Sequence, residues 1–289
     1  MLGRDLVSCL ESRHCVLALT RNEADITDPR LVDQAFDKAE PDIVIHCAAF
    51  TAVDECELQP ELAFKVNAEG TRNIARACRR RGVPVLYLST DYVFDGEKPE
   101  PYVETDRAGP LNAYGRTKLA GEEGVKELAG RFWIVRVSWL FGPWGRNFVR
   151  AILDQAHTGQ PLRVVADQVG APTYTMHLAE KIEAIFTRAE AGIYHVTNQG
   201  YCSWFEFAQE ILHQAGLHHI TVSPIPASAL GRRARRPRNS RLANTRLETS
   251  GLGLLPAWKD AVRSYLSRAM GAEEACGETA SAGGRPRVQ

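Results

Sequence analysis

The sequence predicts an α/β fold, a doubly wound parallel sheet with a smaller second domain. Three observations over residues 1–145 support this prediction. The strand-like runs are apolar throughout, helix-like segments separate them, and the two kinds of segment alternate along the chain. Strands that are apolar on both faces are typical of a parallel sheet covered by helices on each side. From residue 146 the alternation loosens, so we expect 146–270 to be mainly a second, substrate-binding part whose elements interleave with the first domain.

The first elements follow from hydrophobic spacing. Leu2, Leu6 and Leu10 recur on one face of a predicted helix over 2–10, and the apolar run 15–19 is predicted to be a buried strand. Asp28-Pro29 is a helix start signal, which predicts a helix as far as Phe36. The further elements up to residue 145 are, in order, a strand at 43–46, a helix at 60–81, a strand at 85–89, a helix at 112–128 and a strand at 133–137.

The chain opens with a helix, whereas a sheet of this kind normally opens with a strand. In a Rossmann-like fold the first strand leads into a glycine-rich turn, and the dinucleotide pyrophosphate rests on the N-terminus of the next helix. Gly3 has the place of the last glycine of that turn. We therefore expect Leu2 and Gly3 to lie at the cofactor, and the first strand and earlier glycines to precede Met1.

The second part mixes helices with short strands. Ser203 is a helix-capping residue, and Trp258, Val262 and Tyr265 share one face of the last predicted helix. Helices are predicted over 147–157, 175–188, 203–215 and 256–270, and strands over 162–165 and 193–196. The tail 271–289 has almost no large apolar residues, so we predict that it is disordered.

Composition excludes several classes of protein. The 35 basic and 35 acidic residues balance, which argues against nucleic acid or an acidic membrane surface as a partner. No apolar run reaches the roughly 20 residues that span a bilayer, and the start has no signal-peptide pattern. The seven cysteines form no Cys-x-x-Cys pair and no metal-binding spacing, as in a reducing compartment. We expect a cytoplasmic protein without a metal site.

A hydroxyl, a phenol and an ammonium group form the main functional pattern. Thr90 follows the strand 85–89, so its hydroxyl lies at the carboxyl end of that strand. Tyr114 and Lys118 are four residues apart, which places both on one face of the predicted helix. An ammonium beside a phenol favours the phenolate, so we expect Lys118 to lower the pKa of Tyr114 from about 10. Such a set can give a proton to a carbonyl oxygen, which is half of a ketone reduction.

The contexts of these residues resemble a known family. They are Ser-Thr-Asp-Tyr-Val-Phe-Asp-Gly at 89–96 and Tyr-Gly-Arg-Thr-Lys at 114–118, and further matching segments lie at 48–54, 67–68, 135–142, 167–173 and 236–242. Over about residues 1–270 the chain resembles the dTDP-4-dehydrorhamnose reductases, a family of extended short-chain dehydrogenases/reductases. Sugar-nucleotide dehydratases of that superfamily carry Thr-Asp-Glu where this chain has Thr90-Asp91-Tyr92, so the resemblance favours reduction over elimination.

The resemblance implies a reaction and the residues that perform it. Hydride from NADPH would reduce the 4-keto group of dTDP-4-dehydro-L-rhamnose to give dTDP-L-rhamnose, with Tyr114 as the general acid. Lys118 would also bind the nicotinamide ribose, and Thr90 would hydrogen-bond the carbonyl oxygen. The residues expected to contact the sugar nucleotide are Thr51, Val53, Tyr92 and Trp139. Magnesium and a homodimer stay open, because no acidic cluster carries the family's reported metal contact over to this chain.

The cofactor contacts are predicted mainly from strand ends. Ala48 and Ala49 follow a predicted strand and allow close backbone approach. An acid after the second strand of such a fold binds the ribose 2′-hydroxyl of NAD, whereas an arginine accommodates the 2′-phosphate of NADP. Arg21 has that place, which favours NADPH, with NADH as the alternative if Arg21 is only a turn residue. Asp25 and Ile26 match the family's adenine-side contact more loosely.

Several residues and the function itself have alternatives. Trp139 is expected at the sugar, whereas Trp144 and His46 are expected in the core. The basic run 232–238 is expected to close over a diphosphate through arginine–phosphate pairs, with nucleic acid as the weaker alternative. Two rival functions stay open. One is a reductase or epimerase of another nucleotide sugar, and the other is a non-catalytic regulatory subunit with the same fold.

Overall fold

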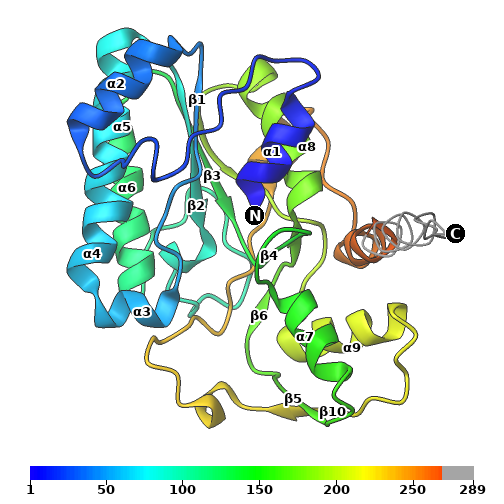
Figure 1. Ribbon diagram of the computed structural model, residues 1–289. Coiled ribbons are helices and arrows are strands. Elements are labelled where there is room, and N and C mark those ends of the chain that lie inside the picture. Colours follow the sequence, from blue (N-terminus) through cyan, green and yellow to red (C-terminus); the bar gives the residue numbers. More distant parts are fainter. Residues whose placement is uncertain (269–289) are drawn as a thin grey trace, which may run out of the picture.

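The computed structural model describes residues 1–268, and the tail predicted to be disordered lies outside them. Figure 1 shows one lobe with a sheet between two layers of helices and a smaller lobe beneath it. The strands of this sheet are parallel, in the order β1-β2-β3-β8. Their bounds are Val44–His46 for β1, Val85–Thr90 for β2, Phe132–Val137 for β3 and Gly192–His195 for β8. The predicted α/β fold with a parallel sheet is therefore confirmed.

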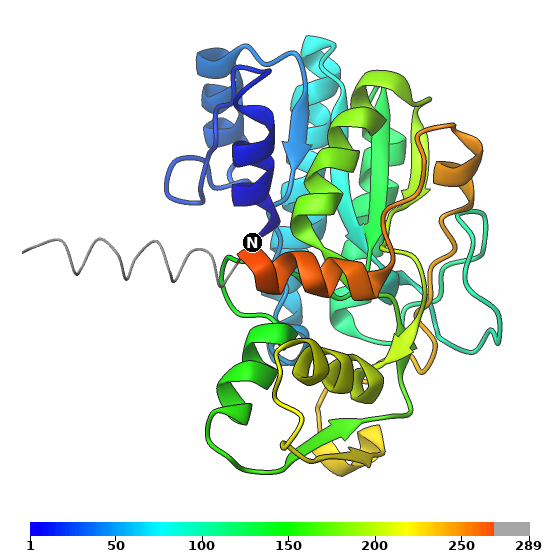
Figure 2. The same cartoon turned by 90° about the vertical axis from the view of Figure 1, so that its right-hand side faces the viewer.

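Helices cover both faces of the sheet (Figures 1 and 2). On one face lie α1 (Leu2–Leu10) and α8 (Thr175–Arg188), which share a buried apolar cluster with β2 and β3. The helices on the other face are α2 (Pro29–Ala39), α4 (Pro60–Phe64), α5 (Thr71–Arg81) and α6 (Ala113–Leu128). All six residues of β2 are buried, as expected for a central strand covered on both sides. Within residues 1–268, no helix is both long and apolar enough to cross a membrane.

The smaller lobe combines helices with a two-stranded parallel sheet. Its elements are α7 (Phe148–Ala156), α9 (Trp204–Gln214), β5 (Leu162–Val165) and β10 (Val222–Ile225). Residues 258–268 form a helix that crosses the junction of the lobes in Figure 2, where Trp258 and Tyr265 are buried against this lobe. The remaining short elements are α3 (Val53–Leu58), β4 (Leu140–Phe141), β6 (Val169–Gly170), β7 (Thr173–Tyr174), β9 (Cys202–Ser203) and α10 (Thr245–Thr249).

Local sequence signals explain where several helices begin. Asp28 caps α2 by accepting a hydrogen bond from the Arg30 N–H at 2.9 Å, and Pro29 occupies the first helical position. Ser203 and Glu206 form a reciprocal capping box at the start of α9. Because these signals act over only a few residues, helix starts could be predicted from the sequence.

The predicted buried strand at 15–19 is wrong. These residues have no strand pairing in the described part of the chain, and Leu17 and Leu19 are 53% and 44% exposed. A strand satisfies its backbone N–H and C=O groups through a neighbouring strand. Among the described residues β1 pairs only with β2, so the other edge of β1 is unpaired, and the segment 15–19 does not join the sheet there.

The single helix predicted at 60–81 is interrupted. The structure has α4, then a π-helical turn η1 (Lys65–Gly70), then α5. A π-helical turn inserts extra backbone into a helix, and such turns are frequent at functional sites. Hydrophobic periodicity does not reveal this change, because the chain stays helical on both sides of the turn.

Candidate active site at the carboxyl end of β2

The carboxyl end of β2 presents a hydroxyl group. Thr90 ends the strand and caps the 3-10 turn η2 (Asp91–Val93), where its Oγ1 accepts a hydrogen bond from the Tyr92 N–H at 3.2 Å. The same hydroxyl donates to Asp91 Oδ1 at 3.0 Å. Thr90 is only 5% exposed, so the strand and the turn together fix the direction of its side chain.

Helix α6 brings Tyr114 to this strand end. Asn112 caps the helix by accepting from the Gly115 N–H at 2.8 Å. The turn η2 lies so close to α6 that a Cβ at Gly115 would overlap the Tyr92 carbonyl oxygen. The Thr90 side chain lies close enough to the Tyr114 phenol to lower its pKa, and the Tyr114 ring meets the Tyr92 ring edge to face at 5.9 Å between centroids. The predicted Thr90 and Tyr114 therefore lie together.

Lys118 is buried one turn further along α6. Its Nζ donates to the Leu88 carbonyl oxygen of β2 at 2.6 Å and lies 4.1 Å from the centroid of the Tyr87 ring. Burial lowers the pKa of Lys118 to about 7, while the negative charge of Glu122 acts in the opposite direction. The three residues predicted as catalytic thus all meet where β2 ends and α6 begins.

The predicted lowering of the Tyr114 pKa is wrong for this structure. Burial raises the pKa of the phenol above its usual value, because removal from water disfavours the charged phenolate. The Lys118 ammonium points to a backbone carbonyl of β2, where it does not offset this effect. Tyr114 is therefore protonated at neutral pH, which is the form that a proton donor requires.

Asp91 is a residue of this site that the sequence pattern did not single out. It is 3% exposed, and burial raises the pKa of its carboxyl to about 7, an effect that the nearby side chains of Ser240 and Thr90 oppose. Its Oδ2 is buried without a hydrogen-bond partner among the described residues. The carboxylate also acts on the neighbouring Tyr114, whose pKa it raises further. In the sequence, only its position next to Thr90 indicated that Asp91 lies at the site.

We expect Asp91→Asn to stabilise the protein at alkaline pH. The folded-state pKa of about 7 lies above the usual 3.8, so the folded protein disfavours the ionised carboxyl. Stability is therefore lost as the pH rises from about 4 to about 7, and the loss persists above that range. Asparagine resembles the protonated acid, so the free energy of unfolding should rise by a few kcal/mol at about pH 8 and hardly change near pH 4. Urea unfolding at both pH values measures this.

Asp54→Asn is a matched control with the opposite sign. Hydrogen bonding to Arg236 lowers the pKa of Asp54 to about 2, so its ionised form stabilises the folded state above about pH 4. The amide should therefore destabilise the protein at alkaline pH. A loss of stability in both variants at alkaline pH would contradict the account of Asp91.

The predicted cofactor residues of the first helix lie near the end of β1. Cys47 follows β1 and precedes Ala48 and Ala49. Burial raises the pKa of its thiol, and the positive charges of Lys118 and of the amino terminus both oppose this rise, which places the amino terminus near Cys47. Leu2 is buried in the core, whereas a Cβ at Gly3 would meet nothing within 4 Å. No side chain caps α1. The N–H groups of Leu2 and Gly3 therefore have no side-chain acceptor, whereas the Arg4 N–H donates to the Met1 carbonyl oxygen at 3.1 Å.

The other predicted cofactor residues lie further from this edge. The Arg21 side chain is 77% exposed and pairs with Asp25 at 3.3 Å. Asp25 also accepts hydrogen bonds from the Thr27 N–H and hydroxyl. Ile26 packs where a Cβ at Gly70 would stand, and so ties this segment to the start of α5. Because exposed ion pairs are weak, Arg21 can exchange its partner for another anion.

Three of the four predicted substrate residues lie in or beside segments that pack against α6, the helix of Tyr114. Thr51 precedes α3 and Val53 begins it, and α3 packs its Cys56 against Ala113 and Tyr114 of α6. Tyr92 contacts the Tyr114 ring from η2. The turn η2 and α3, the helix that Val53 begins, thus both pack against α6 near Tyr114.

Trp139, the fourth predicted substrate residue, follows β3. Its backbone has φ of +46°, a left-handed conformation that costs a bulky residue about 1–2 kcal/mol. Its indole stacks on Trp204 at 3.5 Å between centroids, and a Cβ at Gly170 would overlap it. The prediction that Trp144 is a core residue is wrong. The residue is 37% exposed, because its indole N–H reaches the buried Asp5 carboxylate from the surface, at 3.0 Å.

The basic run 232–238 lies against the substrate side of the site. Arg236 pairs with both carboxylate oxygens of Asp54, at 3.1 and 2.8 Å, and Asp54 follows Val53 in α3. The Ala234 N–H donates to the same carboxylate at 2.9 Å. Asn112, which caps α6, donates to the Arg235 carbonyl oxygen at 2.8 Å. The run is therefore fastened to the two helices that border Tyr114.

Asn67 has a supporting role that the sequence did not reveal. It is fully buried in η1, where its Oδ1 accepts from the Phe50 N–H at 2.7 Å and its Nδ2 donates to the Phe50 carbonyl at 3.0 Å. The same Nδ2 donates to Thr117 Oγ1 at 3.0 Å. Asn67 thereby joins the loop that holds Ala49 and Thr51 to α6.

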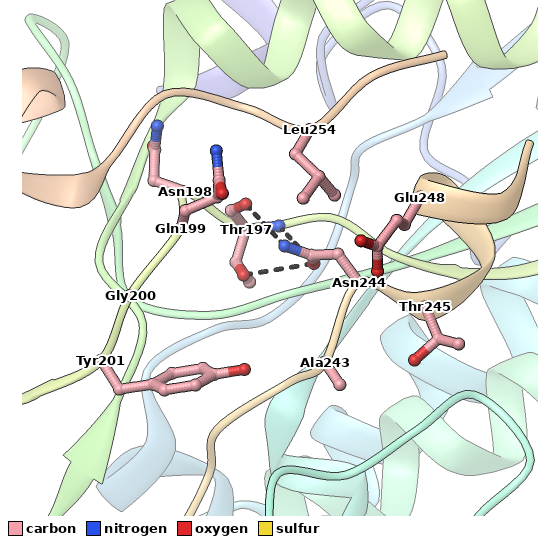
Figure 3. Close-up of a pocket in the computed structure, with 10 residues that line it drawn as sticks. All are labelled: Thr197, Asn198, Gln199, Gly200, Tyr201, Ala243, Asn244, Thr245, Glu248 and Leu254. Atoms are coloured by element: carbon pink, nitrogen blue, oxygen red, sulfur yellow. Dashed lines mark hydrogen bonds between the residues drawn. The ribbon is translucent and has the colours of Figure 1, made fainter. Parts of the chain in front are cut away.

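A separate pocket of about 230 Å³ lies beyond the end of β8 (Figure 3). In Figure 3 the Asn244 amide is hydrogen-bonded to Thr197, and Glu248 and Leu254 form one side of the pocket. The other lining residues are Asn198, Gln199, Gly200, Tyr201, Ala243 and Thr245. None of the predicted site residues lines this pocket, so it is not part of the site around Tyr114.

Comparison with known proteins gives consistent matches along the chain. The family model described as RmlD substrate binding domain matches residues 1–270. A dTDP-4-dehydrorhamnose reductase of Streptomyces griseus is 43% identical over 269 residues, which cover 91% of this chain and 88% of that protein. A dTDP-4-keto-6-deoxy-D-glucose reductase of Streptomyces niveus is 38% identical over 264 residues, covering 91% of this chain and 92% of the relative.

A solved structure is similar as well. The crystal structure of dTDP-4-dehydrorhamnose reductase from Bacillus anthracis, in complex with NADP, has a TM-score of 0.90 and 38% sequence identity to this chain. The match covers 92% of this chain and 95% of the other.

Proposed function

The chain belongs to the dTDP-4-dehydrorhamnose reductase family, and we propose that it uses NADPH to reduce the 4-keto group of dTDP-4-dehydro-L-rhamnose to dTDP-L-rhamnose. The observation that carries this proposal is the meeting of Thr90, Tyr114 and Lys118 at the carboxyl end of β2. Parallel α/β sheets bind ligands at this end of their strands.

Tyr114 is the proposed proton donor. Its raised pKa keeps the phenol protonated at neutral pH, and its contact with Thr90 places two hydroxyl groups together. Both can hydrogen-bond one carbonyl oxygen and stabilise the negative charge that develops on it during reduction.

NADPH supplies the hydride, which none of the protein's side chains can provide. The residues present fit this cofactor. The uncapped first turn of α1 offers N–H donors for a pyrophosphate, and the exposed Ala48 leaves room beside them. Lys118 would hold the nicotinamide ribose, and the exposed Arg21 would pair with the 2′-phosphate, with Asp25 and Ile26 on the adenine side.

We further propose how the rest of the chain serves this reaction. The smaller lobe, with Trp139 at its edge, would bind the sugar nucleotide, and the run 232–238 would bind its diphosphate through arginine side chains. The cysteines within the described residues are all free, which supports a reducing compartment and hence a cytoplasmic location. Assembly as a homodimer is a prediction that analytical ultracentrifugation would test.

A panel of 4-keto-6-deoxy nucleotide sugars tests the substrate. Turnover, followed as cofactor oxidation, should be fastest with dTDP-4-dehydro-L-rhamnose, with kcat/KM at least about tenfold above that for GDP-linked sugars. NADPH should be preferred over NADH. The Streptomyces niveus relative makes dTDP-4-keto-6-deoxy-D-glucose the second substrate to compare, and product analysis distinguishes the two. Turnover of GDP-linked sugars alone would overturn the proposal.

A further inference from the structure

A buried carboxylate lies one helical turn beyond Lys118 on α6. Glu122 is four residues further along α6, on the same face of the helix, and is 0% exposed. Its Oε1 accepts hydrogen bonds from the Ser89 hydroxyl at 2.5 Å and from Arg136 Nε at 2.9 Å. Its Oε2 accepts from Arg136 Nη2 at 2.7 Å. Glu122 therefore connects the helix of Tyr114 and Lys118 to β2, at the residue before Thr90, and to β3.

Arg136 is held on its other side by His195. The guanidinium is 2% exposed and lies 5.1 Å from the centroid of the Phe94 ring. His195 Nδ1 is 3.1 Å from two carbonyl oxygens, those of Tyr102 and Ala243, so Nδ1 carries the proton and donates. His195 Nε2 is then the acceptor for Arg136 Nη1, at 3.4 Å. Burial beside Arg136 lowers the pKa of His195 to about 3, which keeps the ring neutral.

Within the described residues, Glu122 supplies the negative charge for two buried cations, Lys118 and Arg136. The other titratable groups near Lys118 carry no charge at neutral pH. The pKa of His46 on β1 is lowered to about 3, that of Cys47 is raised to about 12, and that of Tyr87 on β2 is also raised. Glu122 itself faces Arg136 from β3 and, more distantly, Lys126 of α6 at 3.8 Å. Removing either partner of a buried pair leaves the other charge uncompensated.

We propose that Glu122 and Arg136 are positioning residues for the reaction. The negative charge of Glu122 favours the cationic form of the buried Lys118. The positive charge of Arg136 partly neutralises Glu122 and so weakens its influence on Lys118. The same pair anchors the end of β2 to α6, and thus Thr90 to Tyr114. The inference rests on the proposed function, because its clearest readout is the pH dependence of turnover.

Charge-changing variants test the inference through shifts of opposite sign. If the cationic form of Lys118 is the active one, kcat falls as the pH rises through its pKa. Glu122→Gln keeps the side-chain shape but removes the negative charge, so this alkaline limb should move to lower pH by about one unit or more. Arg136→Met removes the cation nearest to Glu122, so the effect of Glu122 on Lys118 grows and the limb should move to higher pH. The measurement is kcat at saturating substrate and NADPH across the pH range in which the variants stay folded.

Two neutral or conservative variants separate charge from structure. Glu122→Asp keeps the charge and Ser89→Ala removes only one hydrogen bond, so both should leave the limb within about half a unit of its original pH, whatever they do to kcat. The inference is overturned if the alkaline limb of the kcat profile moves in the same direction in Glu122→Gln and Arg136→Met, or if it moves in neither variant. If Glu122→Gln does not fold, the other two variants decide. The inference is supported if the alkaline limb lies at higher pH in Arg136→Met and is unmoved in Glu122→Asp, and any other result overturns the inference. An unmodified protein without reductase activity would instead refute the proposed function.

Discussion

Replacing Tyr114 with phenylalanine should lower kcat roughly a thousandfold. The substitution removes the hydroxyl that donates the proton, while the ring keeps its partly buried position against Cys56 and its edge-to-face contact with Tyr92. Because the aromatic walls of the site remain, KM for the nucleotide sugar should change much less than kcat. Steady-state kinetics with dTDP-4-dehydro-L-rhamnose and NADPH measure both constants.

Tyr265→Phe is the matched control for this experiment. Tyr265 is buried in the apolar cluster of the smaller lobe, apart from Tyr114, so the same chemical change there should leave kcat within about twofold. A decrease of less than about tenfold in Tyr114→Phe would show that another group donates the proton.

Gly115→Ala should damage both the stability and the activity of the protein. In an ordinary helix this change stabilises by up to about 1 kcal/mol. Here the new methyl group would overlap the Tyr92 carbonyl oxygen and lie 2.9 Å from Pro110 Cβ, so α6 and η2 must separate. Overpacking of this kind costs about 1–3 kcal/mol. A displacement of about 1 Å between Tyr114 and Thr90 should lower kcat roughly a hundredfold.

Gly130→Ala provides the comparison for the glycine variant. Gly130 lies just beyond α6, and a Cβ there would meet only Arg79 Nη1, at an ordinary 3.7 Å. Its free energy of unfolding and its kcat should stay close to those of the unmodified protein. Urea unfolding and kinetics on both variants make the comparison. If Gly115→Ala is as stable and active as Gly130→Ala, the contact between α6 and η2 does not position Tyr114.

Strands and helices were predicted correctly where a pattern of neighbouring residues determines them. The all-apolar run before Thr90 became β2, and the strand predicted at 162–165 and the helix predicted at 175–188 have these same bounds in the structure. Burial on both faces and helix capping depend on neighbouring residues, so they leave a pattern in the sequence. The run 15–19 is equally apolar, but a strand also requires a partner, and no described segment pairs with it.

The candidate site was only partly predictable for the same reason. The spacing of Tyr114 and Lys118 on one helix, together with a hydroxyl at a strand end, indicated a proton donor, because helix periodicity decides which side chains share a face. The direction of the Tyr114 pKa could not be predicted, since it depends on how much water the packed residues exclude. The roles of Asp91 and Asn67 became visible only through their burial and their partners.

The sequence alone therefore establishes the α/β class, most helix starts and the residue types of the proton-transfer site, because each follows from patterns a few residues long. Contacts between distant segments come only from the packed structure. Glu122 meets Arg136 across 14 positions of the chain, and Arg136 meets His195 across 59. Desolvation and pairing of these charges depend on how β2, β3, β8 and α6 are arranged in space, and this arrangement determines the protonation of Tyr114, Lys118 and Asp91.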